Sequence, residues 1–435
     1  MKGILIILDG IGDLPNKQLG GKTPLDAAEM PNLDFLATRG EMGRMYTVKP
    51  GFIPESDQAI ISIFGNELID STRGQLEAIG AGLKLTRGDL ALRANIGTID
   101  SLKSGRVIDR RVGRTLTTEE AEILAKAINK HIKLPCKFEF KSTIQHRGAL
   151  VFRGGFSDNI LGNEKTYLQG RYHEGDKIMP PKALDDDENT MYTLNILKEF
   201  LEKVFEVLDK HPVNEDRRKR GLLPANYLFV RGAGIEPPKL KSYKKWMSIG
   251  YMPLEKGFSQ ACGMTSFEFD YPKLKGLDAY KNLYEGLEKA CKFSIKTLKK
   301  QHKKFDYAYV HIKETDLPGH DNKPLEKKEM LEYVDKTLFK FLRKFAPPKK
   351  IHVVVTGDHS TPCKLKSHSA DPVPVMFYNG SIPRPRKKLS FPNFGKNKEE
   401  EQKPKGAKFC EAEADKGTLG RFNGRDLFRK VAFLK

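Results

Sequence analysis

The sequence predicts an α/β fold with a doubly wound core sheet, and a smaller α+β domain inserted into that core. Three observations support this prediction: short continuous apolar runs, helical patterns between them, and one long segment in which strand and helix signals are mixed. Continuous apolar runs of five or six residues are typical of strands buried on both faces, as in a parallel sheet. Where strands and helices alternate in this way, functional groups lie at the carboxyl ends of the strands.

Four apolar runs predict strands of the core, and each run ends at a polar residue. They are GILIIL before Asp9, NYLFV before Arg231, YAYVHI before Lys313 and IHVVV before Thr356. Because these polar residues follow strands, we expect them at the edge of the sheet that carries function.

Apolar residues at helical spacing predict the helices between the strands. Segment 191–211 carries Leu194, Leu197, Leu201, Val204 and Leu208 in this pattern. Segments 279–305 and 324–345 repeat it, and Pro324 stands at the expected first position of the last helix.

The segment from residue 86 to residue 221 breaks this rhythm and predicts the inserted domain. TLTTEEAEILAKAINKH has a helical pattern, CKFEFKS and ALVFRG read as strands, and KRGLLPAN resembles a return linker. We therefore expect a core domain from residues 1–85 and 222–435, and an inserted α+β domain from residues 86–221. Segment 381–408 is rich in Pro and Lys without periodicity, which predicts a mobile surface loop.

Composition places the chain among cytoplasmic globular proteins. The apolar run Gly3 to Leu8 is too short for a signal peptide or a membrane span, and five scattered cysteines without a CxxC pair are typical of free thiols. The formal charge of +20 could attract nucleic acid, an anionic surface or a small phosphorylated substrate. The basic residues are diffuse, which favours a lysine-rich solvated surface over a nucleic-acid site.

Two of the four polar clusters carry a single candidate residue each. Asp9 in ILDGIGD could be a metal ligand, a helix cap or a turn residue. Ser56 in PESDQAIISIFG precedes an apolar helical run, where serine is a preferred N-cap. A helix N-terminus also offers free N–H groups to an anion, so Ser56 could instead hold a phosphoryl group.

The other two clusters carry histidine next to aspartate. Asp316 and His320 are four positions apart in HIKETDLPGHD, which suits a metal pair or a polar turn. Asp358 and His359 are adjacent in GDHSTPCKLKSHS, and His368 follows nine positions after His359. Adjacent residues on a strand point to opposite faces, so Asp358 and His359 share an ion only after a bend, or reach two ions from it.

The clusters together supply three aspartates, three histidines and one serine, without a thiolate. Such oxygen and nitrogen donors suit Mn²⁺, Mg²⁺ or Zn²⁺. Seven donors exceed what one ion takes from protein, whereas two ions about 4 Å apart would use them and clamp a phosphoryl group. The sequence therefore predicts a two-metal site.

The order Asp…Ser…Asp-x3-His…Asp-His…His resembles the alkaline phosphatase superfamily of binuclear metalloenzymes. The surrounding segments are more specific and resemble cofactor-independent phosphoglycerate mutases of the archaeal type. They include LIILDGIGD, GGKTPLDAAEMPNLDFLATRG, PESDQAIISIFG, TRGQLEAIGAG, RANIGTID, VIDRRVGR, LFVRGAG, KETDLPGHD and GDHSTPCKLKSHSADPVPV. The resemblance runs from Met1 to about Tyr378.

This resemblance implies an alkaline-phosphatase-like core and an isomerase of glycolysis that needs no 2,3-bisphosphoglycerate. It also implies that the inserted domain, residues 86–221, is a lid or substrate domain. It implies one metal on Asp316, His320 and His368, and another on Asp9, Ser56, Asp358 and His359. It also makes Ser56 the nucleophile, which carries the phosphoryl group between 3-phosphoglycerate and 2-phosphoglycerate.

The resemblance further implies anion-binding residues outside the metal site. Lys256 and Arg231 are expected beside the phosphoryl group, and Asp109, Arg110, Arg111 and Arg114 are expected to bind the substrate. A phosphomonoesterase, sulfatase or phosphopentomutase on the same core is the alternative among enzymes. A basic nucleic-acid-binding protein with a degenerate metal core is the alternative from another class.

Overall fold

The computed structural model describes residues 1–68, 72–165, 172–380 and 408–434. The chain divides into two compact units. Unit 1 comprises Met1–Gly65 and Ala290–Lys435, and unit 2 comprises Asn66–Lys289. Helix α9 (Ala279–Gln301) passes from one unit into the other.

The strands of unit 1 lie in a mixed sheet with β1 between two parallel neighbours. Their order is β12 (Tyr307–Ile312), β1 (Gly3–Leu8), β13 (His352–Thr356), β14 (Val373–Tyr378), β2 (Glu41–Tyr46) and β15 (Gly420–Asn423). Every residue of β1, β12, β13 and β14 is buried, as the continuous apolar runs predict. The predicted α/β fold is thus confirmed.

Strand β14, which is not among the predicted runs, departs from the parallel order. This strand runs antiparallel to both β13 and β2. A parallel return needs a crossover that spans the sheet, usually a helix. Between β13 and β14 the chain forms only the loop that carries Asp358 to His368 and a short 3-10 turn, Cys363–Leu365, so β14 returns antiparallel.

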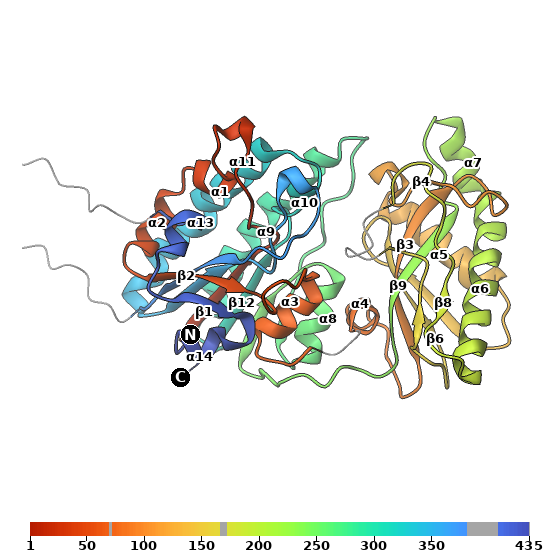
Figure 1. Cartoon of the computed structure of the whole chain (residues 1–435), viewed down its shortest axis with the longest axis horizontal. Coiled ribbons are helices and arrows are strands. Elements are labelled where there is room, and N and C mark those ends of the chain that lie inside the picture. Colours follow the sequence, from red (N-terminus) through yellow and green to blue (C-terminus); the bar gives the residue numbers. More distant parts are fainter. Residues whose placement is uncertain (69–71, 166–171, 381–407, 435) are drawn as a thin grey trace, which may run out of the picture. The chain divides into compact units, whose positions relative to one another are not determined.

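Helices cover both faces of the unit 1 sheet (Figure 1). Helices α1 (Pro24–Ala27), α2 (Pro31–Ala37) and α11 (Pro324–Val334) lie above its strands in that view, and α3 (Ser56–Ile63) and α14 (Leu427–Lys430) lie below them. The predicted helix 324–345 is continuous but widens in its middle: α11 leads into a π-helical turn, Asp335–Phe339, and α12 (Lys340–Phe345) follows. Two shorter helices, α10 (Leu317–His320) and α13 (Glu411–Asp415), complete the unit.

Unit 2 contains an antiparallel sheet. Its strands follow the order β4 (Val107–Asp109), β3 (Leu90–Ile99), β6 (Arg147–Phe152) and β5 (Phe138–Ser142), and β9 (Tyr227–Gly234) also pairs with β3. The run NYLFV therefore lies in β9 beside β3 and antiparallel to it, not in a parallel sheet. It is apolar throughout because helices pack on both faces of this sheet as well, which strand direction alone does not reveal.

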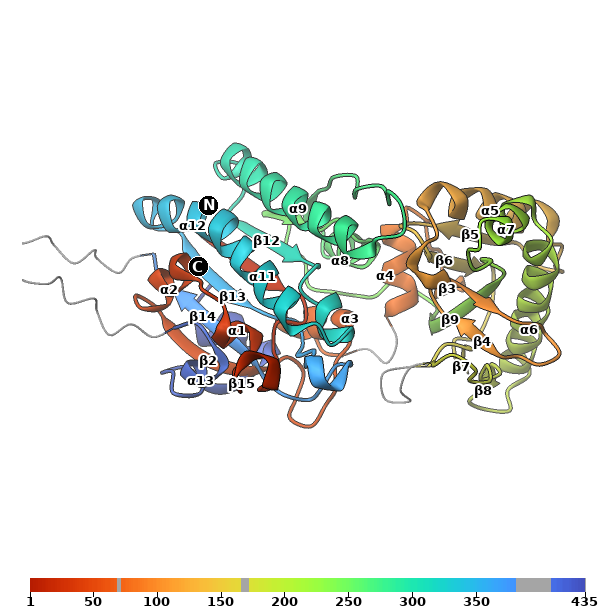
Figure 2. The ribbon, with the colours of Figure 1, turned by 90° about the horizontal axis from the view of Figure 1, so that it is seen from above.

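The helices of unit 2 surround that sheet, as Figure 2 shows. Helices α5 (Thr118–His131) and α6 (Glu188–Asp209) pack on one face with α7 (Pro212–Lys219) beside them, and α4 (Arg73–Gly80) packs on the other. Helix α8 (Pro253–Ala261) lies against α4, where an added Cβ at Gly80 would come within 1.7 Å of the Pro253 carbonyl oxygen. Four short strands also belong to unit 2: β7 (Ile160–Leu161), β8 (Lys182–Ala183), and the parallel pair β10 (Trp246–Ile249) and β11 (Thr265–Phe267).

The predicted domain boundaries do not coincide with the division into compact units. Segments 66–85 and 222–289 fall in unit 2 because α4 and β9 pack on β3 and α8 packs on α4. The assignment of residues 86–221 as a lid or substrate domain stays a prediction.

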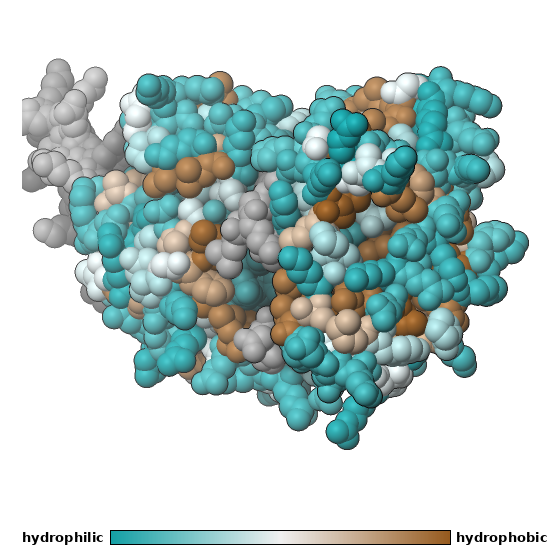
Figure 3. All heavy atoms as spheres, turned by 45° about the vertical axis from the view of Figure 1, so that its right-hand side comes forward, coloured by the Kyte–Doolittle hydropathy of each residue, from teal (hydrophilic) through white to brown (hydrophobic). Residues whose placement is uncertain are grey.

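The surface is largely hydrophilic on the face that Figure 3 draws, as the charged composition leads one to expect. Within the described part of the chain, no helix has the length and apolarity that a membrane crossing requires. The loop predicted at residues 381–408 lies outside the described residues, apart from Lys408.

Candidate active site

The predicted metal ligands of unit 1 meet at the carboxyl ends of three parallel strands. Asp9 follows β1, Asp316 follows β12, and Asp358 follows β13. Because parallel neighbours end at the same edge of a sheet, residues more than 300 positions apart in sequence lie side by side there.

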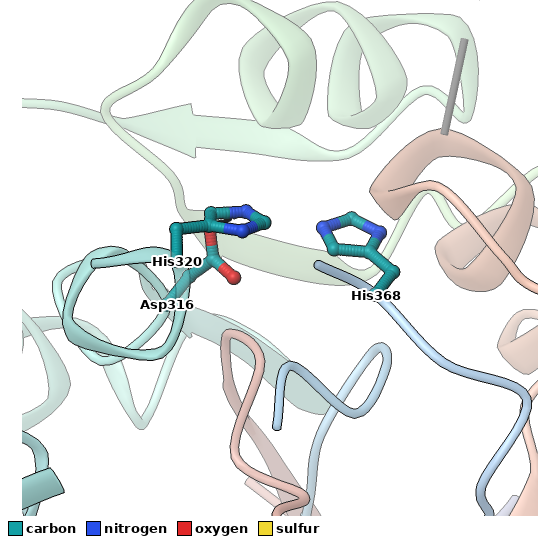
Figure 4. A group of neighbouring side chains, drawn as sticks. All are labelled: Asp316, His320 and His368. Carbon is teal, nitrogen blue, oxygen red and sulfur yellow. Dashed lines mark ion pairs between the residues drawn. The ribbon is translucent and has the colours of Figure 1, made fainter. Parts of the chain in front are cut away.

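One group consists of Asp316, His320 and His368 (Figure 4). One ligand atom from each residue lies within 4.8 Å of those from the other two. His320 Nε2 is 3.0 Å from Asp316 Oδ2, because α10 places these residues one turn apart. His368 approaches from the loop before β14, and its ring is nearly parallel to that of His320 at 5.1 Å between centroids.

The second group consists of Asp9, Asp358 and His359, whose ligand atoms lie within the same 4.8 Å limit. His359 Nε2 is 3.2 Å from Asp9 Oδ1 and 3.4 Å from Asp358 Oδ2. Adjacent residues reach one centre here because the chain bends at the end of β13. The rings of His359 and His368 stack with centroids 3.6 Å apart, so the two groups adjoin.

Ser56 stands at the second group as the first residue of α3. Its hydroxyl oxygen lies 3.3 Å from His359 Nε2. The alternative role of Ser56 as a helix cap is wrong, because Glu55 is the N-cap and forms a capping box with Gln58. The Ser56 hydroxyl is therefore not used to cap its own helix.

The hydrogen bonds of His320 and His368 leave their Nε2 atoms available as ligands. Nδ1 of His320 lies 3.3 Å from the Lys366 carbonyl oxygen, and Nδ1 of His368 lies 2.8 Å from that of Pro54. A carbonyl only accepts, so both Nδ1 atoms carry a proton, and Nε2 is the nitrogen left to face a cation. This arrangement is the one found around metal-bound histidines.

The carboxylates of the second group also fit a cation. Oδ1 of Asp358 accepts hydrogen bonds from the backbone N–H groups of Gly10 and His359, whereas its Oδ2 accepts none. Oδ1 of Asp9 is likewise buried without a hydrogen bond. Two buried carboxylates with unused oxygens favour further positive charge beside them.

Electrostatics within the groups point the same way. Burial lowers the pKa of His359, but the charges of Asp358 and Asp9 outweigh it and raise that pKa to about 9. Burial raises the pKa of Asp316, yet His320 and the other two imidazoles hold it well below its usual range. Each carboxylate thus favours a positive partner, and a divalent ion supplies that charge without a proton.

Three residues near these groups carried no assigned role in the sequence. Lys313, directly after β12, forms an ion pair with Asp9 Oδ2. His311 is fully buried on β12, with Nε2 3.7 Å from Asp358 Oδ2 and Nδ1 2.8 Å from the Tyr309 hydroxyl. Thr361 hydrogen-bonds to both groups. A polar residue inside or after an apolar strand is the signal that could have identified the first two.

Unit 2 brings together two of the predicted substrate-binding residues around a buried carboxylate. Arg110 NH1 lies 3.1 Å from Glu164 Oε1, and Arg231 Nε lies 3.4 Å from Glu164 Oε2. Arg93 of β3 lies 3.2 Å from the same Oε2. Burial raises the pKa of Glu164, but the three guanidinium groups lower it below the usual value, so Glu164 is ionised. Glu164 and Arg93 were not predicted.

The remaining predicted residues of unit 2 lie on a tight turn and on a helix. Asp109 Oδ1 accepts hydrogen bonds from the N–H groups of Arg111 and Gly113, which closes the turn that carries Arg110, Arg111 and Arg114. Val112 and Arg114 have φ values of +54° and +57°, so this turn is strained. Lys256 on α8 forms an ion pair with Glu268.

The chain has the fold and site of an α/β enzyme. Its sheet brings carboxylates, imidazoles and a serine hydroxyl together at the ends of parallel strands. Comparison with known proteins is more specific. The family model of 2,3-bisphosphoglycerate-independent phosphoglycerate mutase matches residues 37–214. The 2,3-bisphosphoglycerate-independent phosphoglycerate mutase of Pyrococcus furiosus is 39% identical over 434 residues, 98% of this chain and 95% of that protein.

Other relatives agree with this assignment. A phosphoglycerate mutase of the same description from Methanocaldococcus jannaschii is 37% identical and covers 88% of this chain and 89% of its own. The structure of the PH0037 protein from Pyrococcus horikoshii matches with a TM-score of 0.72 and 30% identity, over 100% of this chain and 98% of that one. The cofactor-independent phosphoglycerate mutase of Thermoplasma acidophilum matches with a TM-score of 0.56 and 27% identity, over 99% of both chains. The chain belongs to the 2,3-bisphosphoglycerate-independent phosphoglycerate mutase family.

Proposed function

We propose that this chain is an isomerase that interconverts 3-phosphoglycerate and 2-phosphoglycerate without 2,3-bisphosphoglycerate, through a phosphoryl group carried on Ser56. Its relatives over nearly the whole chain are mutases of that description. The observation that carries the catalytic part is the Ser56 hydroxyl, 3.3 Å from His359 Nε2 and beside two buried carboxylates.

The two groups of unit 1 would each hold a divalent ion. Asp316, His320 and His368 form one set of ligands, and Asp9, Asp358 and His359, with Ser56, form the other. Bound ions of this kind lower the pKa of a coordinated hydroxyl and neutralise charge on phosphoryl oxygens. The donors suit Mn²⁺, Mg²⁺ or Zn²⁺.

Ser56 performs both transfers on this account. Its oxygen forms a bond to phosphorus while the bond from phosphorus to the 3-oxygen of the substrate breaks. The glycerate then presents its 2-oxygen, which forms the new bond to phosphorus while the bond to Ser56 breaks. Ser56 is regenerated, and water must stay out, because hydrolysis of phosphoserine would release inorganic phosphate.

Arginines of unit 2 would bind the anionic groups of the substrate. Arg93, Arg110 and Arg231 meet at Glu164, and Arg93 also lies 3.4 Å from Glu77, so three guanidinium groups face two carboxylates and the cluster holds more positive than negative charge. A planar guanidinium matches both phosphate and carboxylate. We assign Arg111 and Arg114 to the same task because their turn begins at Arg110, with Asp109 closing the turn.

Lys256 remains the proposed second cation beside the phosphoryl group, next to Arg231. We place the activity in the cytoplasm, with phosphoglycerate as the partner. Neither nucleic acid nor a membrane is required by this proposal.

The test follows 3-phosphoglycerate by ³¹P NMR with purified protein and Mn²⁺, Mg²⁺ or Zn²⁺, without 2,3-bisphosphoglycerate. Accumulation of 2-phosphoglycerate with little inorganic phosphate supports the mutase. Release of inorganic phosphate as the main product supports a phosphomonoesterase on the same core. No turnover with any of the three ions, together with salt-dependent binding of nucleic acid, supports the non-catalytic alternative.

A further inference from the structure

Thr361 is fully buried and its hydroxyl touches one residue from each of the two ligand groups. Its Oγ1 donates a hydrogen bond to Asp316 Oδ1 at 2.7 Å. The same Oγ1 lies 3.0 Å from Nδ1 of His359. A hydroxyl carries one proton, which is already given to Asp316, so Oγ1 accepts a hydrogen bond from His359 Nδ1–H.

This single hydroxyl therefore fixes two ligands at once. The bond to Asp316 orients the carboxylate of the group that contains His320 and His368. The bond from His359 keeps a proton on Nδ1, so Nε2, the atom that faces Asp9 and Asp358, is the nitrogen available to a cation. Partners of this kind set the orientation and tautomer of metal ligands.

The surrounding backbone prevents Thr361 from turning away. Its N–H donates to the Gly12 carbonyl at 2.9 Å, and its own carbonyl accepts from the Lys327 ammonium at 3.1 Å. A Cβ added at Gly10 would come within 2.7 Å of Thr361 Oγ1, and one added at Gly319 within 2.4 Å of the Thr361 carbonyl oxygen. Glycines at both positions allow the chain to enclose this residue.

We propose that Thr361 is a positioning residue that couples the two cation-binding groups, so that loss of its hydroxyl weakens ion binding at both. This inference rests on the proposed two-metal site but not on the identity of the substrate. Valine has the shape of threonine but lacks the hydroxyl. If Thr361 only filled space, replacing it with valine would leave ion binding unchanged.

The test is calorimetric titration of the full chain with Mn²⁺. The wild type is expected to bind two ions, and Thr361→Val to bind both with about ten- to a hundredfold lower affinity. Thr361→Ser keeps the hydroxyl and is expected to restore both affinities. Thr356→Val is the matched control, because Thr356 is also fully buried but its hydroxyl bonds to the carbonyl of Pro374, away from the ligands.

The outcomes separate this inference from the proposed site. Wild-type affinities at both sites in Thr361→Val, or a loss at one site alone, would overturn the coupling. Fewer than two bound ions in the wild type would overturn the two-metal site and the inference with it. Circular dichroism of the ion-free proteins checks that each variant folds. If Thr361→Val does not fold, the same titration is carried out with Thr361→Ala.

Discussion

The Ser56 hydroxyl and the His359 imidazole lie 3.3 Å apart although 303 positions separate them in the chain. The start of α3 supplies one and the bend after β13 supplies the other. Since His359 Nδ1 is engaged with Thr361, Nε2 is the ring nitrogen that faces Ser56 and would meet a bound cation. A serine oxygen is thereby held beside the atoms that would bind a cation, where its nucleophilicity can be raised.

Removal of this hydroxyl should abolish isomerisation. In Ser56→Ala, no atom remains to accept the phosphoryl group, so kcat should fall by at least about a thousandfold. Ser62→Ala on the same helix removes another buried hydroxyl and should retain wild-type kcat. The measurement is 2-phosphoglycerate formation by coupled assay; substantial turnover in Ser56→Ala would exclude the phosphoserine route.

Divalent ions should stabilise the protein against unfolding. A ligand that binds the folded state alone adds about 2.7 kcal/mol at a hundred times its Kd. Mn²⁺ should therefore raise the melting temperature of the wild type after treatment with a chelator. Asp358→Asn removes a charge whose Oδ2 accepts no hydrogen bond, and should lose most of this response. An equal rise in both proteins would place the ions elsewhere.

Loss of the Glu164 charge should impair substrate binding more than the chemical step. In Glu164→Gln, Arg93, Arg110 and Arg231 lose their shared counter-charge and repel one another. We expect KM to rise by about tenfold or more, with a smaller change in kcat. Glu236→Gln is the control, since Glu236 and its partner Arg87 are exposed and such pairs contribute at most about 1 kcal/mol. An unchanged KM in Glu164→Gln would remove this cluster from the substrate site.

The stability of unit 2 should depend on acid pH, because the buried Arg217 forms an ion pair with Glu120. Burial raises the pKa of Glu120, but hydrogen bonds from Thr117 N–H and Arg220 and the charge of Arg217 bring it below the usual value. A lowered folded pKa means that this carboxylate stabilises the fold above its unfolded pKa of about 4.3 and loses that effect as pH falls through the folded pKa.

Glu120→Gln should accordingly lower the free energy of unfolding by roughly 1–3 kcal/mol at about pH 7. The difference from the wild type should shrink as the pH falls below about 4. Glu122→Gln, at an exposed position of the same helix, is the control. The free energy of unfolding is measured by urea denaturation, with hydrogen exchange in α5 as the local probe. A difference between variant and wild type that does not depend on pH would contradict the charge-based explanation.

The sequence predicted those features that depend on strand order and local pattern. Asp9, Asp316 and Asp358 could be placed together because each follows an apolar strand, and parallel strands end at one edge. The antiparallel course of β14 and β9 could not be predicted, because a strand buried on both faces has the same apolar pattern in either direction.

Residues that act through other residues could not be predicted from the sequence either. Thr361 owes its two hydrogen bonds to a bend whose shape depends on close contacts with glycines from distant segments. Glu164 meets arginines from β3, β9 and the turn after β4, and no spacing along the chain reveals such a convergence. Charge partners of this kind become visible only once the strands are in register.

Direct detection of phosphorylated Ser56 is the most decisive measurement of the central claim. Wild-type protein with Mn²⁺ and 3-phosphoglycerate is quenched in acid within milliseconds, digested, and examined by mass spectrometry. The account predicts a phosphorylated peptide whose modification lies on Ser56, which disappears when the substrate is exhausted by a coupled enzyme. Phosphate on another residue, or rapid formation of 2-phosphoglycerate with Ser56 unmodified at every time, would contradict it.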